Sequence, residues 1–236
     1  MSGTTVGRLT DLRRYPVKSL VGEALERVEV DARGLRGDRL WCVRDPDGKL
    51  GSGKSSRRFR AMDGLLSLRA RYDGDVPVID LPDGRAVRGD DAGVHDALSA
   101  LVGRPVTLSH EAEVSHFDDG PVHLVTAASL AALGDALGEP VEVRRFRPNL
   151  VVDTGGAPGY EEDTWLGRRV AVGEVVLGIE AFMPRCVMVT MPQVGLAAEP
   201  RLLHTVTAAN DGHLGVLAEV LVPGSVAVGD DVRLLP

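Results

Sequence analysis

Cys186 is the residue in this sequence with the clearest capacity for chemistry. It lies in the run Phe182–Thr190, where an apolar segment is broken by Pro184 and followed by Arg185 and then the thiol. A neighbouring cation and a loop position both favour the thiolate, which is the form that binds metals and attacks electrophiles. The alternative is a small buried apolar side chain, because free cysteine is among the most often buried residue types. The residue alone leaves both interpretations open.

Four further segments combine basic groups, hydroxyls and turns in a way that suits an anionic ligand. Arginine can grip phosphate through two parallel hydrogen bonds, lysine adds a point charge, and asparagine offers both a donor and an acceptor. No segment is specific alone, and their spread along the chain indicates one pocket assembled by folding. The segments are Tyr15–Ser19, Gly37–Trp41, Leu124–Leu130 and Arg145–Asn149.

Another segment, Gly48–Ser55, matches the phosphate-loop pattern of nucleotide triphosphatases. Such a loop needs a buried strand before it and a helix directly after it, so that backbone amides and the helix dipole converge on phosphate. Here an Asp-Pro-Asp tripeptide precedes Gly48, which predicts a hairpin turn with two carboxylates near the supposed site. We therefore interpret the match as coincidental. The basic residues of this stretch are expected to form a basic face: Lys54, Arg57, Arg58 and Arg60.

Composition places the chain among ordinary globular proteins. Its 236 residues are 44% hydrophobic and 26% charged, and the net charge of -7 argues against a general nucleic-acid surface. No apolar run approaches the roughly 18 residues of a membrane span, and the first residues lack the apolar core of a signal peptide. We expect a cytoplasmic protein with no nucleic-acid or membrane partner. In that reducing environment Cys42 and Cys186 are not expected to form a disulfide.

The elements that must position these residues are mostly short strands. The Asp-Pro-Asp-Gly turn at 45–48 and the Leu-Pro-Asp-Gly turn at 81–84 each predict a hairpin. Apolar spacing predicts helices over Asp90–Leu101 and Ala127–Leu137, the second capped by Thr126. The expected strands are Val6–Leu12, Leu25–Val30, Arg39–Val43, Leu65–Tyr72, Val76–Leu81, Val122–Thr126, Asn149–Val152, Arg168–Val172, Val175–Ala181, Cys186–Thr190, Leu217–Val222 and Val232–Leu235.

These elements predict a strand-rich α+β protein in two parts. An acidic polar stretch at Ser109–Gly120 separates two strand-bearing halves, so the expected domains are residues 1–110 and 111–236. Within this stretch Asp118 and Asp119 could transfer protons at the edge of a cleft, but a hydrated connecting loop is favoured.

Other polar residues offer no competing site. The six histidines lack the close pairing of a zinc-binding helix, so a histidine metal site is not expected. Cys42 lies in the apolar run Leu40–Val43 and is expected in the core, and Trp165 is expected to anchor packing or a lid edge.

In their order along the chain, these segments resemble the MOSC family, named after the C-terminal domain of molybdenum cofactor sulfurase. The likeness covers nearly the whole chain and includes the N-terminal β-barrel domain found in some members. It implies a MOSC-type β-barrel with an N-terminal barrel-like domain and a few short helices. The matching segments are Tyr15–Ser19, Gly34–Arg39, Arg145–Asn149, Tyr160–Trp165, Arg185–Cys186 and Val220–Asp230.

The members that this chain resembles are of the amidoxime reducing component type, which binds the molybdenum cofactor through a pterin dithiolene and one protein cysteine. The resemblance therefore implies that Cys186 is the metal ligand and catalytic residue. A soft thiolate suits molybdenum that already has sulfur ligands. The resemblance also implies a set of further cofactor contacts: Lys18, Ser19, Arg39, Thr126, Ser129, Arg147, Asn149 and Arg185.

The implied function is that of a molybdenum-dependent oxidoreductase, which reduces small N-hydroxylated or N-oxygenated compounds by oxygen-atom transfer. Some bacterial relatives add an iron–sulfur domain, whereas this chain has no further cysteines, so a separate protein is expected to donate electrons. The alternative is a carrier of the cofactor or a sulfur-transfer protein that uses Cys186. The nearly neutral region Arg201–Asn210 leaves the substrate class and cofactor retention open, and pyridoxal phosphate binding is a further open possibility.

Overall fold

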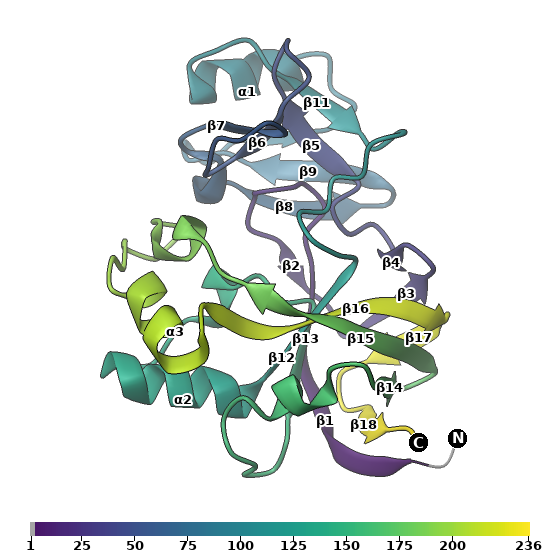
Figure 1. Ribbon diagram of the computed structural model, residues 1–236. Helices are drawn as coiled ribbons and strands as arrows, with labels where there is room; N and C mark the ends of the chain where they lie inside the picture. Colours follow the sequence, from purple (N-terminus) through teal and green to yellow (C-terminus); the bar gives the residue numbers. More distant parts are fainter. Residues whose placement is uncertain (1–2) are drawn as a thin grey trace.

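The computed structural model describes residues 3–236, and its larger part is a closed barrel (Figure 1). Seven strands follow one another in the order β13-β12-β16-β15-β14-β18-β1, and β1 pairs with β13 to close the ring. The short strand β2 (Glu23–Ala24) pairs with the end of β1. The expected strand-rich barrel is thereby confirmed. The barrel strands are β1 (Thr4–Arg14), β12 (Val122–Thr126), β13 (Leu150–Asp153), β14 (Arg169–Val172), β15 (Val175–Pro184), β16 (His213–Val222) and β18 (Asp231–Leu234).

Strands β12 and β13 pair in parallel, so the chain between them must cross over to the other end of the barrel. Helix α2 (Ala127–Leu137) supplies this crossover, beginning at Thr126, whose side chain accepts a hydrogen bond from the Ser129 amide, and ending at Gly138 in the left-handed conformation. All five residues of β12 are buried. A second helix, α3 (Leu202–Asn210), packs beside α2.

The barrel interior is filled by alternating apolar side chains that face inward from most of its strands. Leu9, Leu12, Leu124 and Trp165 are at most 1% exposed and belong to one cluster of buried residues. A separate cluster around Leu133 and Val206 packs the two helices onto the barrel wall. The barrel is therefore a packed core, and any ligand site must lie at its edge.

The smaller part of the molecule lies above the barrel in Figure 1 and contains two small sheets, whereas a third sheet packs against the barrel and shares its core. The smaller part has its own core, which gathers residues such as Val17, Leu68 and Leu98. The two sheets of the smaller part comprise β5 (Trp41–Arg44) with β6 (Leu50–Ser52), β7 (Phe59–Ala61) and β11 (Thr107–His110), and β8 (Arg69–Asp73) with β9 (Val76–Asp80) and β10 (Ala86–Arg88). The sheet on the barrel comprises β3 (Arg27–Asp31), β4 (Gly34–Leu35) and β17 (Gly224–Ala227). Helix α1 (Val94–Val102) covers the upper core.

The first strands of the chain belong to the larger part. The N-terminal strand β1 lies in the barrel with C-terminal strands, and β3 pairs with the C-terminal strand β17 on the side of the barrel. The sequence boundary between residues 110 and 111 stays a prediction.

Most local predictions agree with the structure. Both proline-glycine turns connect antiparallel strands, with Gly48 and Gly84 at φ values of +78° and +85°. The helix predicted over Ala127–Leu137 has the observed bounds, whereas the helix Leu202–Asn210 was not anticipated.

The strand predicted at Cys186–Thr190 is wrong. After Cys186 the chain forms the short 3-10 helix η4 (Val187–Thr190), in which the Val189 amide donates to the Cys186 carbonyl. The neighbouring strand β16 pairs with β15 only as far as Pro184, so no strand partner remains for the residues that follow. The remaining 3-10 segments are η1 (Leu65–Ser67), η2 (Val143–Arg145) and η3 (Glu161–Trp165).

Candidate functional site

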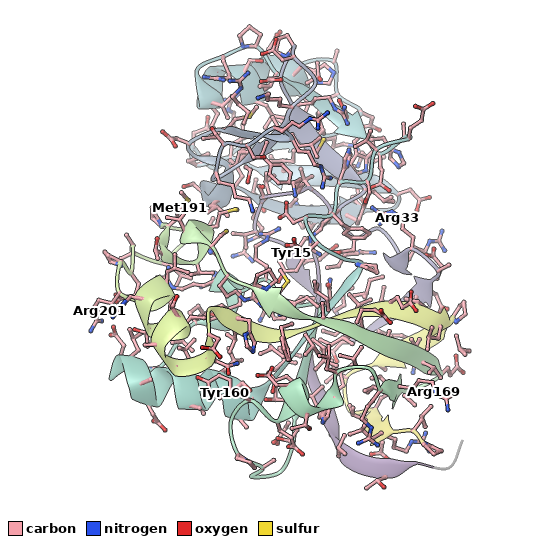
Figure 2. All side chains as sticks on the ribbon, viewed as in Figure 1. Tyr15, Arg33, Tyr160, Arg169, Met191 and Arg201 are labelled. Atoms are coloured by element: carbon pink, nitrogen blue, oxygen red, sulfur yellow. The ribbon has the colours of Figure 1, made fainter. Side chains whose placement is uncertain are left out.

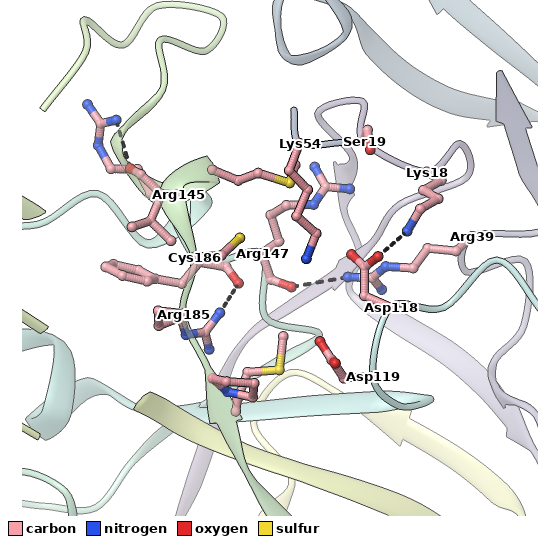
Figure 3. A pocket seen from close by; sticks show the side chains of 15 residues that line it. Lys18, Ser19, Arg39, Lys54, Asp118, Asp119, Arg145, Arg147, Arg185 and Cys186 are labelled. Carbon is pink, nitrogen blue, oxygen red and sulfur yellow. Dashed lines mark hydrogen bonds and ion pairs between the residues drawn. The ribbon is translucent and has the colours of Figure 1, made fainter. Parts of the chain in front are cut away.

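A pocket of about 240 Å³ lies where the end of β15 meets loops from both parts of the molecule (Figure 3). Six of the predicted site residues line it: Lys18, Ser19, Arg39, Arg147, Arg185 and Cys186. Folding therefore brings together residues that are up to 168 positions apart in sequence. The other lining residues are Lys54, Asp118, Asp119, Arg145, Phe146, Met183, Pro184, Met188 and Val189.

The backbone of this pocket is held in an unusual conformation at three of these positions. Ser19, Arg39 and Arg147 have φ values of 66°, 52° and 55°, in the left-handed region that non-glycine residues seldom adopt. Each such residue costs roughly 1–3 kcal/mol and persists because surrounding contacts over-determine it. Because the three strained residues share one pocket, we infer that the surrounding structure maintains the strain in order to position their side chains.

The ring of Tyr15 supports two of the cationic side chains that line the pocket. Figure 2 shows it at the waist between the two parts of the molecule. The guanidinium groups of Arg39 and Arg147 lie 4.7 and 4.2 Å from the centre of its ring. Its hydroxyl donates to the Pro148 carbonyl at 3.0 Å, and burial raises the pKa of this hydroxyl to about 12. Tyr15 is therefore a neutral platform for two positive charges.

Arg39 is the only one of the buried basic groups here that has a fully buried carboxylate partner among residues 3–236. Its guanidinium pairs with Asp38, which is 0% exposed and also accepts a hydrogen bond from the Tyr15 amide at 2.7 Å. Burial opposes the charge of Arg39, but Asp38 and Tyr15 more than offset that cost, and the pKa of Arg39 is raised. Arg39 is therefore a permanent cation.

Lys18 is a buried ammonium group whose charge is easily lost. The residue is 2% exposed, and its Nζ lies 2.6 Å from Oδ1 of Asp118. Burial lowers the pKa of Lys18 to about 8 despite this carboxylate. Its charge is thus sensitive to pH and to any anion that enters.

Arg147 has a hydrogen-bond donor that no described residue satisfies. Its Nη1 donates to the Leu20 carbonyl at 2.5 Å, whereas its Nη2 is buried and has no partner within residues 3–236. Burial and the neighbouring Arg39 lower the pKa of Arg147 to about 10. A buried donor without a partner is costly, so this group suits an anionic ligand that accepts a hydrogen bond from it.

On the opposite wall, Arg185 lies next to Cys186 at the end of β15. Its Nη1 donates to the Phe146 carbonyl at 3.0 Å, and its Nη2 donates to the Leu214 carbonyl and to Nε2 of His123. Burial lowers the pKa of Arg185 to about 9 and, together with Arg185, holds the pKa of His123 well below its usual value. His123 is therefore a neutral acceptor that orients Arg185.

Cys186 itself is half-buried, and its thiol has no hydrogen-bond partner in the described part of the chain. Cys42 is different, because it is 0% exposed and contacts Nε2 of His116 at 3.2 Å. Burial raises the pKa of Cys42 to about 11 and lowers that of His116 to about 4, so both are neutral. Cys186 is thus the only one of the two thiols that can bind a ligand in this pocket.

Three predicted cofactor contacts lie outside the pocket. Asn149 is 1% exposed, accepts a hydrogen bond from the His123 amide, and donates to the Arg13 carbonyl. Thr126 and Ser129 are also buried and direct their hydroxyls to the carboxylate of Glu162. These side chains fasten barrel segments to one another, so the structure does not support them as lining residues.

Glu162 is a buried carboxylate held by three hydrogen bonds. The Thr126 amide, the Thr126 hydroxyl and the Ser129 hydroxyl donate to it at 3.2, 2.7 and 2.6 Å. We expect Glu162→Ala to lower the free energy of unfolding by about 2–4 kcal/mol, because it strands these buried groups. Urea denaturation measures this. Glu142→Ala, which removes a half-exposed carboxylate, serves as the control and should lower the free energy of unfolding by less than about 0.5 kcal/mol. Equal losses in both variants would contradict the role of Glu162.

The segment that resembles a phosphate loop has a packing role. A Cβ on Gly51 would lie 2.8 Å from Leu65, and one on Gly53 would lie 2.6 Å from the Met191 sulfur. Gly51 therefore allows close packing inside the smaller part, and Gly53 allows close approach between the two parts of the molecule. No helix follows Ser52 in this segment, although Lys54 reaches the pocket wall. The interpretation of the motif as coincidental agrees with this geometry.

Four lining residues were not among the predicted cofactor contacts, although Arg145 lies in a candidate segment and the two aspartates had a place at a cleft edge as the less favoured alternative: Lys54, Arg145, Asp118 and Asp119. The two aspartates belong to the connecting strap, residues 111–120, which was expected to be a hydrated loop. Arg58 holds this strap by donating to the carbonyls of Ser115 and Phe117 at 2.8 and 3.1 Å. The available signal was the pair of adjacent carboxylates beside a histidine.

Comparison with known families agrees with this architecture. The MOSC domain matches residues 111–233, which is more than half of the chain, and the MOSC N-terminal beta barrel domain matches residues 6–85. The chain belongs to the MOSC domain family.

Individual relatives match from three quarters to nearly all of this MOSC chain. Human mitochondrial amidoxime-reducing component 1 is 28% identical over 98% of this chain and 83% of its own length. Bovine mitochondrial amidoxime reducing component 2 is 25% identical over 96% of this chain and 83% of its own. Rice molybdenum cofactor sulfurase is 24% identical over 76% of this chain but only 28% of its own length.

Among solved structures, the YuaD protein of Bacillus subtilis has the same fold. It superposes with a TM-score of 0.52 at 16% identity and covers 99% of this chain and 96% of its own. In the described residues no helix is long and apolar enough to cross a membrane, and no cluster of three or more histidine, cysteine or acidic residues is arranged to hold a metal ion. None of the reported relatives is named for pyridoxal phosphate, and that possibility gains no support.

Proposed function

We propose that this MOSC protein is a molybdenum cofactor-dependent oxidoreductase that reduces small N-hydroxylated or N-oxygenated compounds. The observation that carries the proposal is the position of the Cys186 thiol, which opens onto a pocket lined by buried and half-buried cations. Support also comes from the names of the relatives, two of which are amidoxime-reducing components.

The residues present fit such a cofactor. Cys186 offers one soft ligand, which suits molybdenum whose other ligands are dithiolene sulfurs. The Nη2 donor of Arg147, together with Lys18 and Arg39, would hold a phosphate-bearing anion on the facing wall. When bound, the cofactor would supply the two-electron reduction of an N–O bond.

The remaining pocket residues would orient the reactants. Arg185, held by His123 and two carbonyls, keeps a positive charge next to the thiol. Met183, Met188 and Val189 give the pocket an apolar side against which an uncharged substrate body can pack. The second thiol, Cys42, is buried and neutral, so a separate electron-donor protein is part of the proposal.

The second candidate function is cofactor carriage or sulfur transfer through Cys186. The likeness to a molybdenum cofactor sulfurase over 76% of the chain favours it. Turnover distinguishes the two functions. Protein loaded with the cofactor is supplied with benzamidoxime and dithionite-reduced methyl viologen, and benzamidine is measured. Many product molecules per protein support the oxidoreductase, whereas release of the cofactor without product supports the carrier.

Anion binding in the pocket should depend on the charge of Lys18. Because burial lowers the pKa of Lys18 to about 8, its ammonium group loses its proton as pH rises through that value. The affinity for sulfate, which keeps its charge across this range, should therefore fall between pH 7 and about pH 9. Calorimetric titration of the cofactor-free protein measures this change. Lys18→Met should remove the pH dependence near 8, and a variant that kept it would contradict the assignment.

A further inference from the structure

Two carboxylates of the strap, Asp118 and Asp119, are the only acidic groups among the described residues that line the pocket. Six basic side chains and two acidic ones line it. Asp118 is neutralised by its ion pair with Lys18 at 2.6 Å. Asp119 makes no hydrogen bond and no ion pair within residues 3–236, although its charge influences Arg185. Asp119 is thus a solvent-exposed carboxylate on the pocket wall that no described residue engages.

Asp119 lies on the side of the pocket that faces the candidate metal ligand. In Figure 3 its carboxylate lies between Arg185 and Asp118, across from the strand that carries Cys186. Asp118 is among the charges that act on Arg147, which stacks on Tyr15, whereas Asp119 is among those that act on Arg185. A phosphate-bearing group would be repelled by Asp119, so this carboxylate suits the other reactant.

We propose that Asp119 is a substrate-binding residue that selects N-hydroxylated compounds whose reduced product is a cation. The proposal rests on the proposed function and specifies its substrate class. For an amidoxime the balance is R–C(=NOH)NH2 + 2e⁻ + 3H⁺ → R–C(NH2)2⁺ + H2O, with electrons from reduced methyl viologen or the donor protein and protons from solvent. The N–O bond breaks, its oxygen leaves as water, and a positive charge develops on the amidine.

A carboxylate next to that developing charge favours the transition state more than the neutral substrate. Asp119 can also accept hydrogen bonds from the N–H and O–H groups of the bound amidoxime. An aromatic N-oxide without N–H groups gives a neutral product and gains neither contact. Asp119 should therefore distinguish the two classes of N-oxygenated substrate.

The test compares Asp119→Asn with wild type in cofactor-loaded protein, using reduced methyl viologen as the electron source. For benzamidoxime, kcat/KM should fall about tenfold or more, the effect of one hydrogen bond to a charged group. For pyridine N-oxide it should change by less than about twofold, because that product carries no positive charge. Glu113→Gln, on the same strap but outside the pocket, should alter neither substrate. Equal losses for both substrates, or no loss for either, would overturn the proposal.

A binding measurement separates this proposal from the proposed function. Wild type should bind benzamidine, a cation, more tightly than its neutral isostere benzamide, and Asp119→Asn should remove that preference while Asp119→Glu restores part of it. If loaded wild type reduces neither substrate, the proposed function fails, and the benzamidine preference still decides on Asp119. Equal affinity for benzamidine and benzamide in wild type would overturn the assignment of Asp119.

Discussion

Cys186→Ala is expected to abolish reduction of N-oxygenated compounds and leave the fold intact. Loss of a residue that merely orients a metal ligand costs 10–100-fold in activity or affinity, so loss of the ligand itself should lower kcat/KM by at least about 100-fold. The side chain is half-buried in the pocket and forms no hydrogen bond within residues 3–236, so its removal strands no partner. Benzamidoxime turnover with reduced methyl viologen measures the loss, and urea denaturation measures the stability.

The other cysteine provides a matched control. Cys42 is fully buried next to His116 and lies outside the lined pocket. Cys42→Ala should cost about 1–2 kcal/mol of stability, as expected for a shortened core side chain, and should keep turnover per folded molecule. If Cys42→Ala abolished turnover and Cys186→Ala retained it, the assignment of the thiols would be wrong.

Arg147→Met is expected to weaken anion binding strongly without destabilising the protein. The guanidinium is buried between Tyr15 and the pocket, with one donor unsatisfied. Loss of its hydrogen bonds to a bound anion should lower the affinity for sulfate about 10–100-fold. The substitution loses the hydrogen bond to the Leu20 carbonyl, but it also removes a charge that burial and Arg39 disfavour. Because these effects oppose each other, the unfolding free energy of the ligand-free protein should change by less than about 1 kcal/mol.

The neighbouring Arg144 is the control for this substitution. It donates to Glu142 and to the Val194 carbonyl and does not line the pocket. Arg144→Met should leave sulfate affinity within about twofold of wild type, because it makes none of the charge-assisted contacts to the anion. A large loss of stability in Arg147→Met with unchanged sulfate binding would show that Arg147 serves the fold alone.

The sequence predicted correctly those secondary-structure elements whose ends are determined by neighbouring residues. Thr126 and Gly138 delimit α2 because a hydroxyl cap and a left-handed glycine act within a few residues. Cys186–Thr190 was apolar enough for a strand, but strand formation requires a free neighbouring edge, and β16 offers none beyond Pro184. The sequence could not show this because the pairing partner lies some 30 residues away.

The candidate site shows the same limit. Lys18, Arg39 and Arg147 could be recognised from their types and turns, and the family resemblance placed them together. For Asp119 the sequence favoured a hydrated loop over the edge of a cleft, because the path of the strap depends on Arg58 and on the burial of His116. Conversely, Thr126 and Ser129 match the family segment, but their hydroxyls are engaged by Glu162. Which polar groups remain free is settled by tertiary hydrogen bonding.

The most direct test is the molybdenum content of protein produced in cells with an intact cofactor pathway. Elemental analysis should find close to one molybdenum per chain in wild type and in Cys42→Ala, and almost none in Cys186→Ala. Wild type without molybdenum under these conditions, or a Cys186→Ala variant that retains it, would contradict the assignment of Cys186 as the metal ligand.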